Sequence, residues 1–162
     1  MIFVTVGTHE QQFDRLIKAV DKLAGAEKFK DNFLVQSGYS TYKCRNCNQK
    51  KFMSYSEMRV AMEQARIVIC HGGPSTFMKS LSLNKGTIVV PRRKKYAEHV
   101  NDHQLHFAEE VVRKGYPIEV VEDVNQLESA IRNCTDTNQK TISNNKKFND
   151  NLISLINKMM VK

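Results

Sequence analysis

The stretch Ile67-Val-Ile-Cys-His-Gly-Gly-Pro-Ser-Thr76 decides the fold of this chain. It opens with an apolar run without alternation, the pattern of a strand buried on both faces of a parallel sheet. A glycine turn and a predicted helix over 75–83 follow, with Pro74 at the helix start and Asn84-Lys-Gly86 as the stop signal. Thr87-Ile-Val-Val90 is a second buried run, so this region predicts a β-α-β unit.

The same alternation continues on both sides. A β-rich run over 2–6 ends at Gly7, with helical periodicity over 13–23, and a run over 33–35 is closed by Ser37-Gly38. A polar stretch reaches about Lys51, and we expect helices over 56–65 and 100–114, a strand over 118–121 and a helix opening near Asp123. The pattern predicts an α/β fold with one Rossmann-like, doubly wound parallel sheet.

Length, charge and termini restrict the class of protein. With 162 residues we expect a single domain over 1–162, in which 144–162 forms a helix whose apolar face packs on the core or docks on a partner. The net charge of +8 favours anionic partners. We find no leader and no apolar run of about 18 residues, and so expect a cytoplasmic protein unless something tethers it.

The four cysteines are expected to be free thiols in a reducing compartment. Cys44-Arg-Asn-Cys47 has the spacing of half a zinc site, but the second pair is missing from the sequence, and the interpretation favours a loop pair without a metal.

Candidate ligand-binding residues follow the ends of the predicted strands, where open α/β sheets bind ligands. Gly72, Gly73, Pro74, Ser75 and Thr76 would present amides and hydroxyls at a helix N-terminus, which suits a diphosphate. The alternative is a tight turn with an ordinary Ser/Thr cap. Gly7 and Thr8 repeat the arrangement after the first strand.

A third segment, over 92–104, combines cations with hydrogen-bonding side chains. Arg92 and Arg93 could assist the phosphates, and Asp102 and Gln104 could bind sugar hydroxyls. The basic cluster over 92–95 could also face acidic lipid headgroups, or it could be a solvated loop.

Four motifs of this sequence resemble those of one known family. They are Val-Thr-Val-Gly-Thr-His over 4–9, Cys-His-Gly-Gly-Pro-Ser-Thr over 70–76, Ile-Val-Val-Pro-Arg over 88–92 and His-Val-Asn-Asp-His-Gln over 99–104. Together they resemble the C-terminal domain of family 28 glycosyltransferases, which is the donor half of the GT-B architecture. More narrowly, the chain looks like the catalytic subunits of bacterial capsule and exopolysaccharide glycosyltransferases and the soluble subunit of the dolichol-pathway UDP-N-acetylglucosamine transferase.

This resemblance implies a UDP-sugar as donor substrate, no cofactor, and a membrane-anchored partner subunit that supplies the lipid-linked saccharide acceptor. The chain would then lie at the inner face of the membrane through that partner, as a hexosyltransferase that inverts the anomeric carbon and acts only with the partner. The diphosphate would lie against the glycine turns, the sugar near His99, Asp102 and Gln104, and uracil near Phe52 and Met53. One position departs from the family: Lys79 stands where a ribose-binding glutamate is common.

Transfer needs a base for the acceptor hydroxyl and a way to stabilise the departing UDP. The helix N-terminus can stabilise the departing UDP without a metal, and His9 and Glu10 are the candidate catalytic bases, unless they only cap the first helix.

A UDP-sugar-binding or regulatory module without catalysis is the alternative function, and a basic nucleic-acid-binding protein is a second one. We expect no nucleic-acid partner because aromatic-basic interleaving is missing. Gly-x-Gly-x-x-Gly is missing too, which argues against an oxidoreductase.

Overall fold

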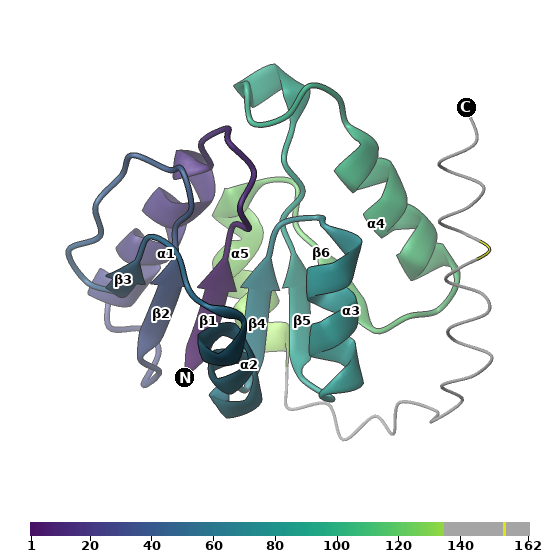
Figure 1. The fold of residues 1–162 in the computed structure, drawn as a ribbon. Helices are drawn as coiled ribbons and strands as arrows, with labels where there is room; N and C mark the ends of the chain where they lie inside the picture. The colour runs from purple at the N-terminus through teal and green to yellow at the C-terminus, as the bar shows by residue number, and fades with distance from the viewer. Residues whose placement is uncertain (135–153, 155–162) are drawn as a thin grey trace.

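The computed structural model describes residues 1–134 and Ser154. Within this part of the chain, six parallel strands form one sheet in the order β3-β2-β1-β4-β5-β6 (Figure 1). The predicted doubly wound, Rossmann-like sheet is therefore confirmed. The strands are β1 (Ile2–Thr5), β2 (Phe33–Gln36), β3 (Asn48–Lys50), β4 (Ile67–Cys70), β5 (Gly86–Val89) and β6 (Ile118–Val120).

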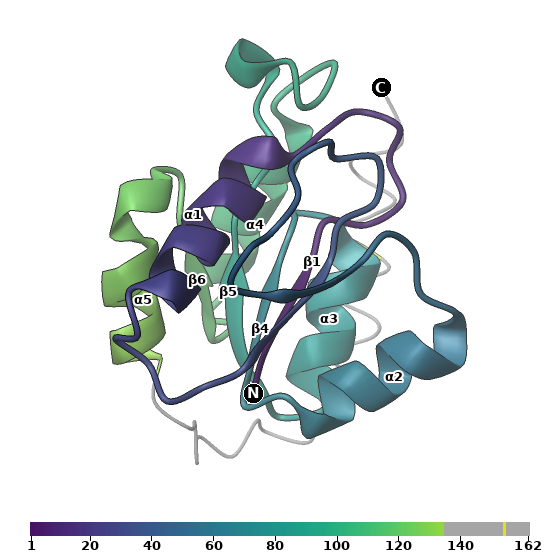
Figure 2. The ribbon, with the colours of Figure 1, turned by 90° about the vertical axis from the view of Figure 1, so that its left-hand side faces the viewer.

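Helices cover both faces of the sheet (Figure 2). Helices α1 (Asp14–Gly25) and α5 (Leu127–Asn133) pack on one face, and α2 (Tyr55–Gln64), α3 (Pro74–Ser82) and α4 (His103–Arg113) pack on the other. Two 3-10 turns, η1 (Lys94–Tyr96) and η2 (Val124–Gln126), lie in the connections. Each face of the sheet thus has its own helix layer and its own core.

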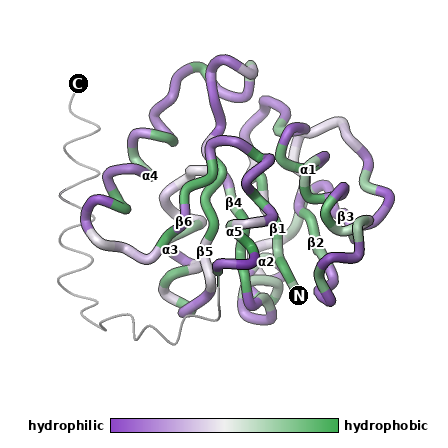
Figure 3. The backbone as a smooth tube through the Cα atoms, turned by 180° about the vertical axis from the view of Figure 1, so that it is seen from behind, coloured by the Kyte–Doolittle hydropathy of each residue, from purple (hydrophilic) through white to green (hydrophobic). Residues whose placement is uncertain are grey.

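Alternate residues of the central strands face the two cores. In β1, Ile2 and Val4 belong to the core under α1, whereas Phe3 belongs to the core under α3 and is also fully buried. Both faces of these strands are covered, so every residue in them is apolar or hydrogen-bonded. This is why their sequences do not alternate between apolar and polar residues. The tube is accordingly mostly green along β1, β4 and the later part of β5 (Figure 3).

The expected start and stop signals of α3 act where the sequence placed them. Pro74 is the first residue of α3, and Asn84 adopts a left-handed conformation with φ of 55° just after that helix ends. Asp123 caps the 3-10 turn η2 rather than a helix, since its carboxylate accepts a hydrogen bond of 3.0 Å from the Asn125 amide, and Gln126 is the N-cap residue of α5. The helix expected to open near Asp123 therefore begins only at Leu127, after this turn.

Two other details of the sequence map were wrong. The stretch up to Lys51 contains the edge strand β3, which the sequence analysis left as a polar stretch because its residues are polar and mostly exposed. Helix α4 begins at His103 and not at Val100, since the residues before it belong to the loop that follows β5. The helix expected over 144–162 lies outside the described residues, apart from Ser154.

A membrane-spanning helix would need a length and an apolar character that none of the described helices has.

Candidate functional site

The sheet order reverses between β1 and β4. Strand β1 pairs with β2 on one side and with β4 on the other, so the connections after β1 and β4 diverge to opposite faces of the sheet. In open α/β sheets this reversal leaves a crevice at the carboxyl ends of the strands, where ligands bind. The loop after β1 and the start of α3 therefore meet at the place expected for a donor site.

His71 occupies the space between these two connections. A Cβ atom on Gly7 would lie 2.6 Å from Cε1 of His71, and one on Gly73 would lie 2.4 Å from its Nε2. Gly7 also has φ of +74°, which favours glycine. The imidazole ring thus leaves no room for a side chain at either glycine. The sequence analysis quoted His71 in its motif but did not select it for the site.

The ring of His71 is neutral at physiological pH. Burial lowers the pKa of His71 to about 4, and the nearby Arg92 guanidinium lowers it further than burial alone would. Its Nδ1 atom is enclosed, and no group among residues 1–134 or Ser154 hydrogen-bonds to it. A neutral imidazole whose Nδ1 has no hydrogen-bond partner among the described residues therefore lies between Gly7 and Gly73.

Helix α3 points its N-terminus at this crevice. Gly73 is the N-cap residue, Pro74 has no amide hydrogen to offer, and no side chain of the described residues caps the helix. Ser75 is exposed and Thr76 is partly exposed in the first turn. An uncapped N-terminus combines unpaired amides with the positive end of the helix dipole, so it favours an anionic ligand.

Three of the amides predicted for the diphosphate are used inside the protein. The Gly72 amide donates to Oε1 of Gln104 over 3.1 Å, the Gly7 amide donates to Oε1 of Gln36 over 3.2 Å, and the Thr76 amide donates to the Gly73 carbonyl over 3.2 Å. This part of the prediction does not fit the geometry, because the sequence alone did not show which side chains approach the two glycines. The start of α3 from Gly73 onward is what faces outward.

Gln36 was missed by the sequence analysis. It is buried at the end of β2, accepts a 2.6 Å hydrogen bond from the Thr5 hydroxyl, and donates to the carbonyls of Gly7 (3.1 Å) and Lys51 (3.2 Å). It therefore fixes the loop after β1 and the end of β3 together. The available signal was a glutamine at the end of the otherwise apolar run over 33–36.

Gln104 and Asp102 lie at the start of α4, close to the loop after β4. Gln104 uses one oxygen to accept from the amides of Gly72 and Arg92, both at 3.1 Å, which leaves its amide nitrogen as the group for a ligand. Asp102 accepts from the Lys94 amide at 2.9 Å and from Arg93 at 3.2 Å. The Lys94 hydrogen bond, above the other causes, holds the pKa of Asp102 below its ordinary value.

Arg92 does not fit the expectation of a cation that is open to the phosphates. Its side chain is fully buried, and its guanidinium donates to the carbonyls of Val6 (2.8 Å), Gln11 (2.9 Å), Gln12 (3.0 Å) and Glu98 (3.2 Å). It also lies over the Phe13 ring, 4.8 Å from the ring centroid. Arg92 thus joins the loop after β1 to the loop after β5. The sequence did not predict this role, because Arg92 is one of four consecutive cations and nothing in the sequence distinguishes the buried one.

Arg93 is also engaged, in ion pairs with Asp102 and Glu122, and its side chain is 14% exposed. The cation nearest to the predicted sugar-binding carboxylate is therefore a partner of that carboxylate. Lys94 and Lys95 of the same cluster are exposed.

His9 and His99 face each other across the two loops, with ring centroids 4.8 Å apart. Nδ1 of His9 accepts from the Gln11 amide at 3.2 Å, and Nδ1 of His99 accepts from the Asn101 amide at 3.3 Å. Both rings therefore carry their proton on Nε2 when neutral. Burial, above the nearby Arg92 charge, lowers the pKa of His9, so it is a neutral group beside the exposed Glu10.

The remaining predicted residues lie on the same sheet edge or on α3. Phe52 is 44% exposed just after β3, and its ring meets Tyr39 edge-on with centroids 5.2 Å apart, next to the partly buried Met53. Lys79 is exposed on α3, one helical turn after Ser75 and on the same side of the helix. Thr8 is exposed in the loop after β1.

Comparisons with known proteins agree with this architecture. Residues 1–159 match the glycosyltransferase family 28 C-terminal domain. Among solved structures, the chain is similar to the glycotransferase of kitacinnamycin, with a TM-score of 0.63 and 17% identity over 85% of this chain and 35% of that chain. It is also similar to the glycosyltransferase SnogD from Streptomyces nogalater, with a TM-score of 0.49 and 15% identity over 85% of this chain and 39% of that one. No curated protein matches the chain by sequence. The chain spans much less than half the length of these two structures.

Proposed function

Because the chain belongs to the glycosyltransferase family 28 C-terminal domain family, we propose that it is the donor-binding half of a glycosyltransferase that uses a UDP-sugar. The observation that carries the proposal is the uncapped N-terminus of α3 beside Gly7 and His71, at the reversal of the sheet order. A nucleoside diphosphate bears the negative charge that this position favours.

The diphosphate would contact Gly73, Ser75 and Thr76, with Gly7 and Thr8 lining the opposite side. The sugar would lie toward the Gln104 amide nitrogen, Asp102 and His99, and uracil toward Phe52 and Met53. The exposed Phe52 ring supports this, because an aromatic face can stack on a base. Lys79 stands where the resemblance implies an acidic ribose contact, so either other residues bind the ribose or the donor binds more weakly.

In the proposed reaction the acceptor hydroxyl oxygen attacks the anomeric carbon, and the bond from that carbon to the UDP oxygen breaks. The hydroxyl proton passes to a base, for which His9 and Glu10 are the candidates in this chain. His9 would accept the proton on Nδ1 in place of its hydrogen bond from the Gln11 amide. The helix N-terminus stabilises the negative charge on the departing UDP. The reaction would invert the anomeric carbon and would need no metal at the diphosphate, since oriented amides do that work.

We further propose that the acceptor site belongs to a separate, membrane-anchored subunit that presents a lipid-linked saccharide in surface polysaccharide synthesis. This proposal rests on the resemblance of the motifs over 4–9, 70–76, 88–92 and 99–104 to the catalytic subunits of capsule and exopolysaccharide glycosyltransferases. The chain would then work on the cytoplasmic side of the membrane, held there by its partner.

Calorimetric titration of the chain with UDP and UDP-sugars tests the donor site. Ser75→Glu places a carboxylate at the proposed phosphate position, where it also suits the helix dipole, so we expect loss of binding without loss of stability. Ser129→Glu makes the same change in the first turn of α5, on the other face of the sheet, and should bind UDP like the wild type. Binding that survives Ser75→Glu would contradict the site.

Transfer is tested with membranes from cells that lack this chain but keep the partner. We expect sugar to pass from a radiolabelled UDP-sugar to lipid only when purified chain and membranes are combined. UDP binding without transfer under these conditions would favour the alternative of a non-catalytic, regulatory module.

A further inference from the structure

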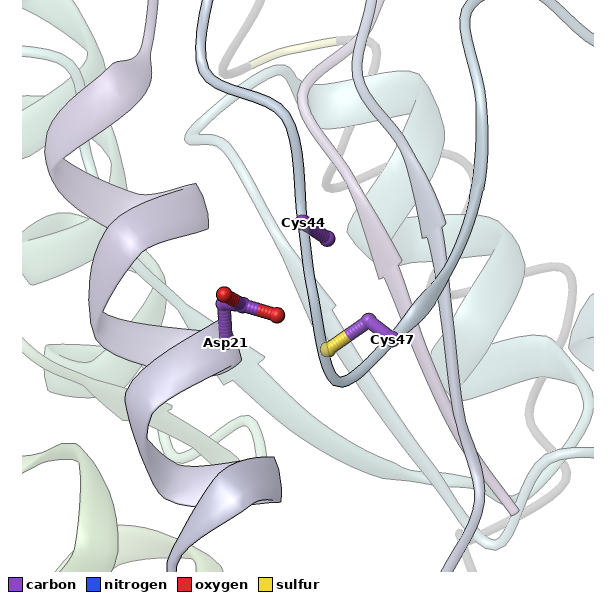
Figure 4. Close-up of side chains that lie close together, drawn as sticks. All are labelled: Asp21, Cys44 and Cys47. Atoms are coloured by element: carbon purple, nitrogen blue, oxygen red, sulfur yellow. The ribbon is translucent and has the colours of Figure 1, made fainter.

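A second cluster of chemical groups lies away from the crevice. Asp21 of α1 meets Cys44 and Cys47 of the loop between β2 and β3, and one ligand atom from each residue lies within 4.8 Å of the others. The Cys47 thiol points toward the carboxylate (Figure 4). The sequence showed only the cysteine half of this arrangement, and the fold adds an oxygen from another element.

Asp21 is a buried charge without a cation. It is 2% exposed, and the ion pairs found among the described residues do not include it. The buried carboxylate of Glu98, by contrast, pairs with Arg15. A buried carboxylate that has hydrogen-bond donors but no ion-pair partner creates a negative potential at the two thiols, which a bound cation would neutralise.

The loop is folded around this carboxylate. The amides of Asn46 (2.7 Å) and Arg45 (3.0 Å) and the Tyr42 hydroxyl (2.9 Å) all donate to Asp21. These bonds fix the carboxylate and hold the two cysteines of the turn on its side, in the way that outer hydrogen bonds orient metal ligands. Both cysteines are only partly buried, so an ion can reach them from solvent.

We propose that Asp21, Cys44 and Cys47 bind a thiophilic divalent cation, with zinc as the preferred ion, which pins the 42–47 turn to α1. Two thiolates and a carboxylate match the ligand preferences of zinc, and a water completes the tetrahedron. Zinc binds thiolates, so binding releases the two thiol protons to solvent while two metal–sulfur bonds form.

The site is independent of the proposed donor crevice. It lies between α1 and the loop that precedes β3, whereas the donor would bind at α3, so its occupancy can be measured without any nucleotide. Its expected effect is on the stability of the loop and of the edge strand β3.

Cobalt titration of the full, reduced and metal-free chain tests the proposal. We expect one Co²⁺ per chain with a thiolate-to-cobalt charge-transfer absorption, which Zn²⁺ abolishes by displacing the cobalt. Cys44→Ser and Cys47→Ser should each weaken binding by more than roughly 100-fold, the upper end of outer-shell effects. Asp21→Asn keeps a hydrogen-bond acceptor and should also weaken it.

Cys134→Ser is the matched control, because Cys134 lies beside Gly86 at a different place in the fold. It should leave the cobalt spectrum and stoichiometry unchanged. Absence of the charge-transfer band in the reduced wild-type chain would overturn the proposal, and so would a band that persists in the Cys44→Ser/Cys47→Ser double variant. Circular dichroism establishes that each variant is folded.

Discussion

At the scale of single residues, Gly73 and Gly7 both lack room for a side chain beside His71, and Gly7 also has a backbone conformation that favours glycine. We expect Gly73→Ala to lower the free energy of unfolding by about 1–3 kcal/mol, because its Cβ would lie 2.4 Å from Nε2 of the ring. In a His71→Ala background this cost should largely vanish. Gly7→Ala should keep a cost of roughly 1–2 kcal/mol there, because its φ of +74° strains any side chain. Denaturant unfolding of the single and double variants measures both.

Equal costs of Gly73→Ala in both backgrounds would show that the imidazole is not what requires the glycine.

His71 also predicts a pH dependence of stability. Its folded-state pKa is about 4, below the ordinary value of 6.5, so the unfolded chain binds the extra proton between these two values. Stability from this group is therefore complete above about pH 6.5 and is lost as the pH falls toward 4, by up to about 3 kcal/mol. Unfolding free energies of the wild type and His71→Asn across this window isolate the effect, since the other titrating groups cancel in the difference.

A parallel decline of stability in both proteins across that window would contradict the assignment to His71.

At the scale of elements, Arg92 joins the connections after β1 and β5. We expect Arg92→Met to lower the free energy of unfolding by about 3 kcal/mol or more, because four carbonyls lose their donor in a buried place. Arg113→Met provides the control: this arginine is 72% exposed in a surface ion pair, and its loss should change stability within about 0.5 kcal/mol. Urea unfolding measures both variants. If they lose similar amounts of unfolding free energy, Arg92 does not join the two loops in the way described.

At the scale of the whole molecule, a donor that binds the native chain must stabilise it. UDP at 100 times its dissociation constant should raise the free energy of unfolding by about 2.7 kcal/mol. The proposed donor site uses helix amides in place of a metal at the diphosphate, so added Mg²⁺ or Mn²⁺ should not tighten UDP binding in calorimetry. A dependence of UDP affinity on either ion would contradict metal-independent donor binding.

Much of the architecture followed from the sequence, because the information is local. The run over 67–70, the turn at Gly72-Gly73 and the stop at Asn84 depend on burial on both faces and on backbone conformations that few residues adopt. The exposed edge strand β3 escaped prediction because its polar residues bury no regular face.

Contacts between residues distant in the sequence were shown by the tertiary structure alone. The sequence by itself determined the sheet and the position of the α3 N-terminus, and it predicted the edge on which a ligand would bind. It could not determine that Arg92 is buried, that Gln36 and Gln104 occupy the glycine amides, or that Asp21 meets the two cysteines. Each of these facts joins residues from different elements, and composition and periodicity describe one element at a time. Only packing decides which of many similar polar side chains becomes buried, and that burial is what sets its chemistry.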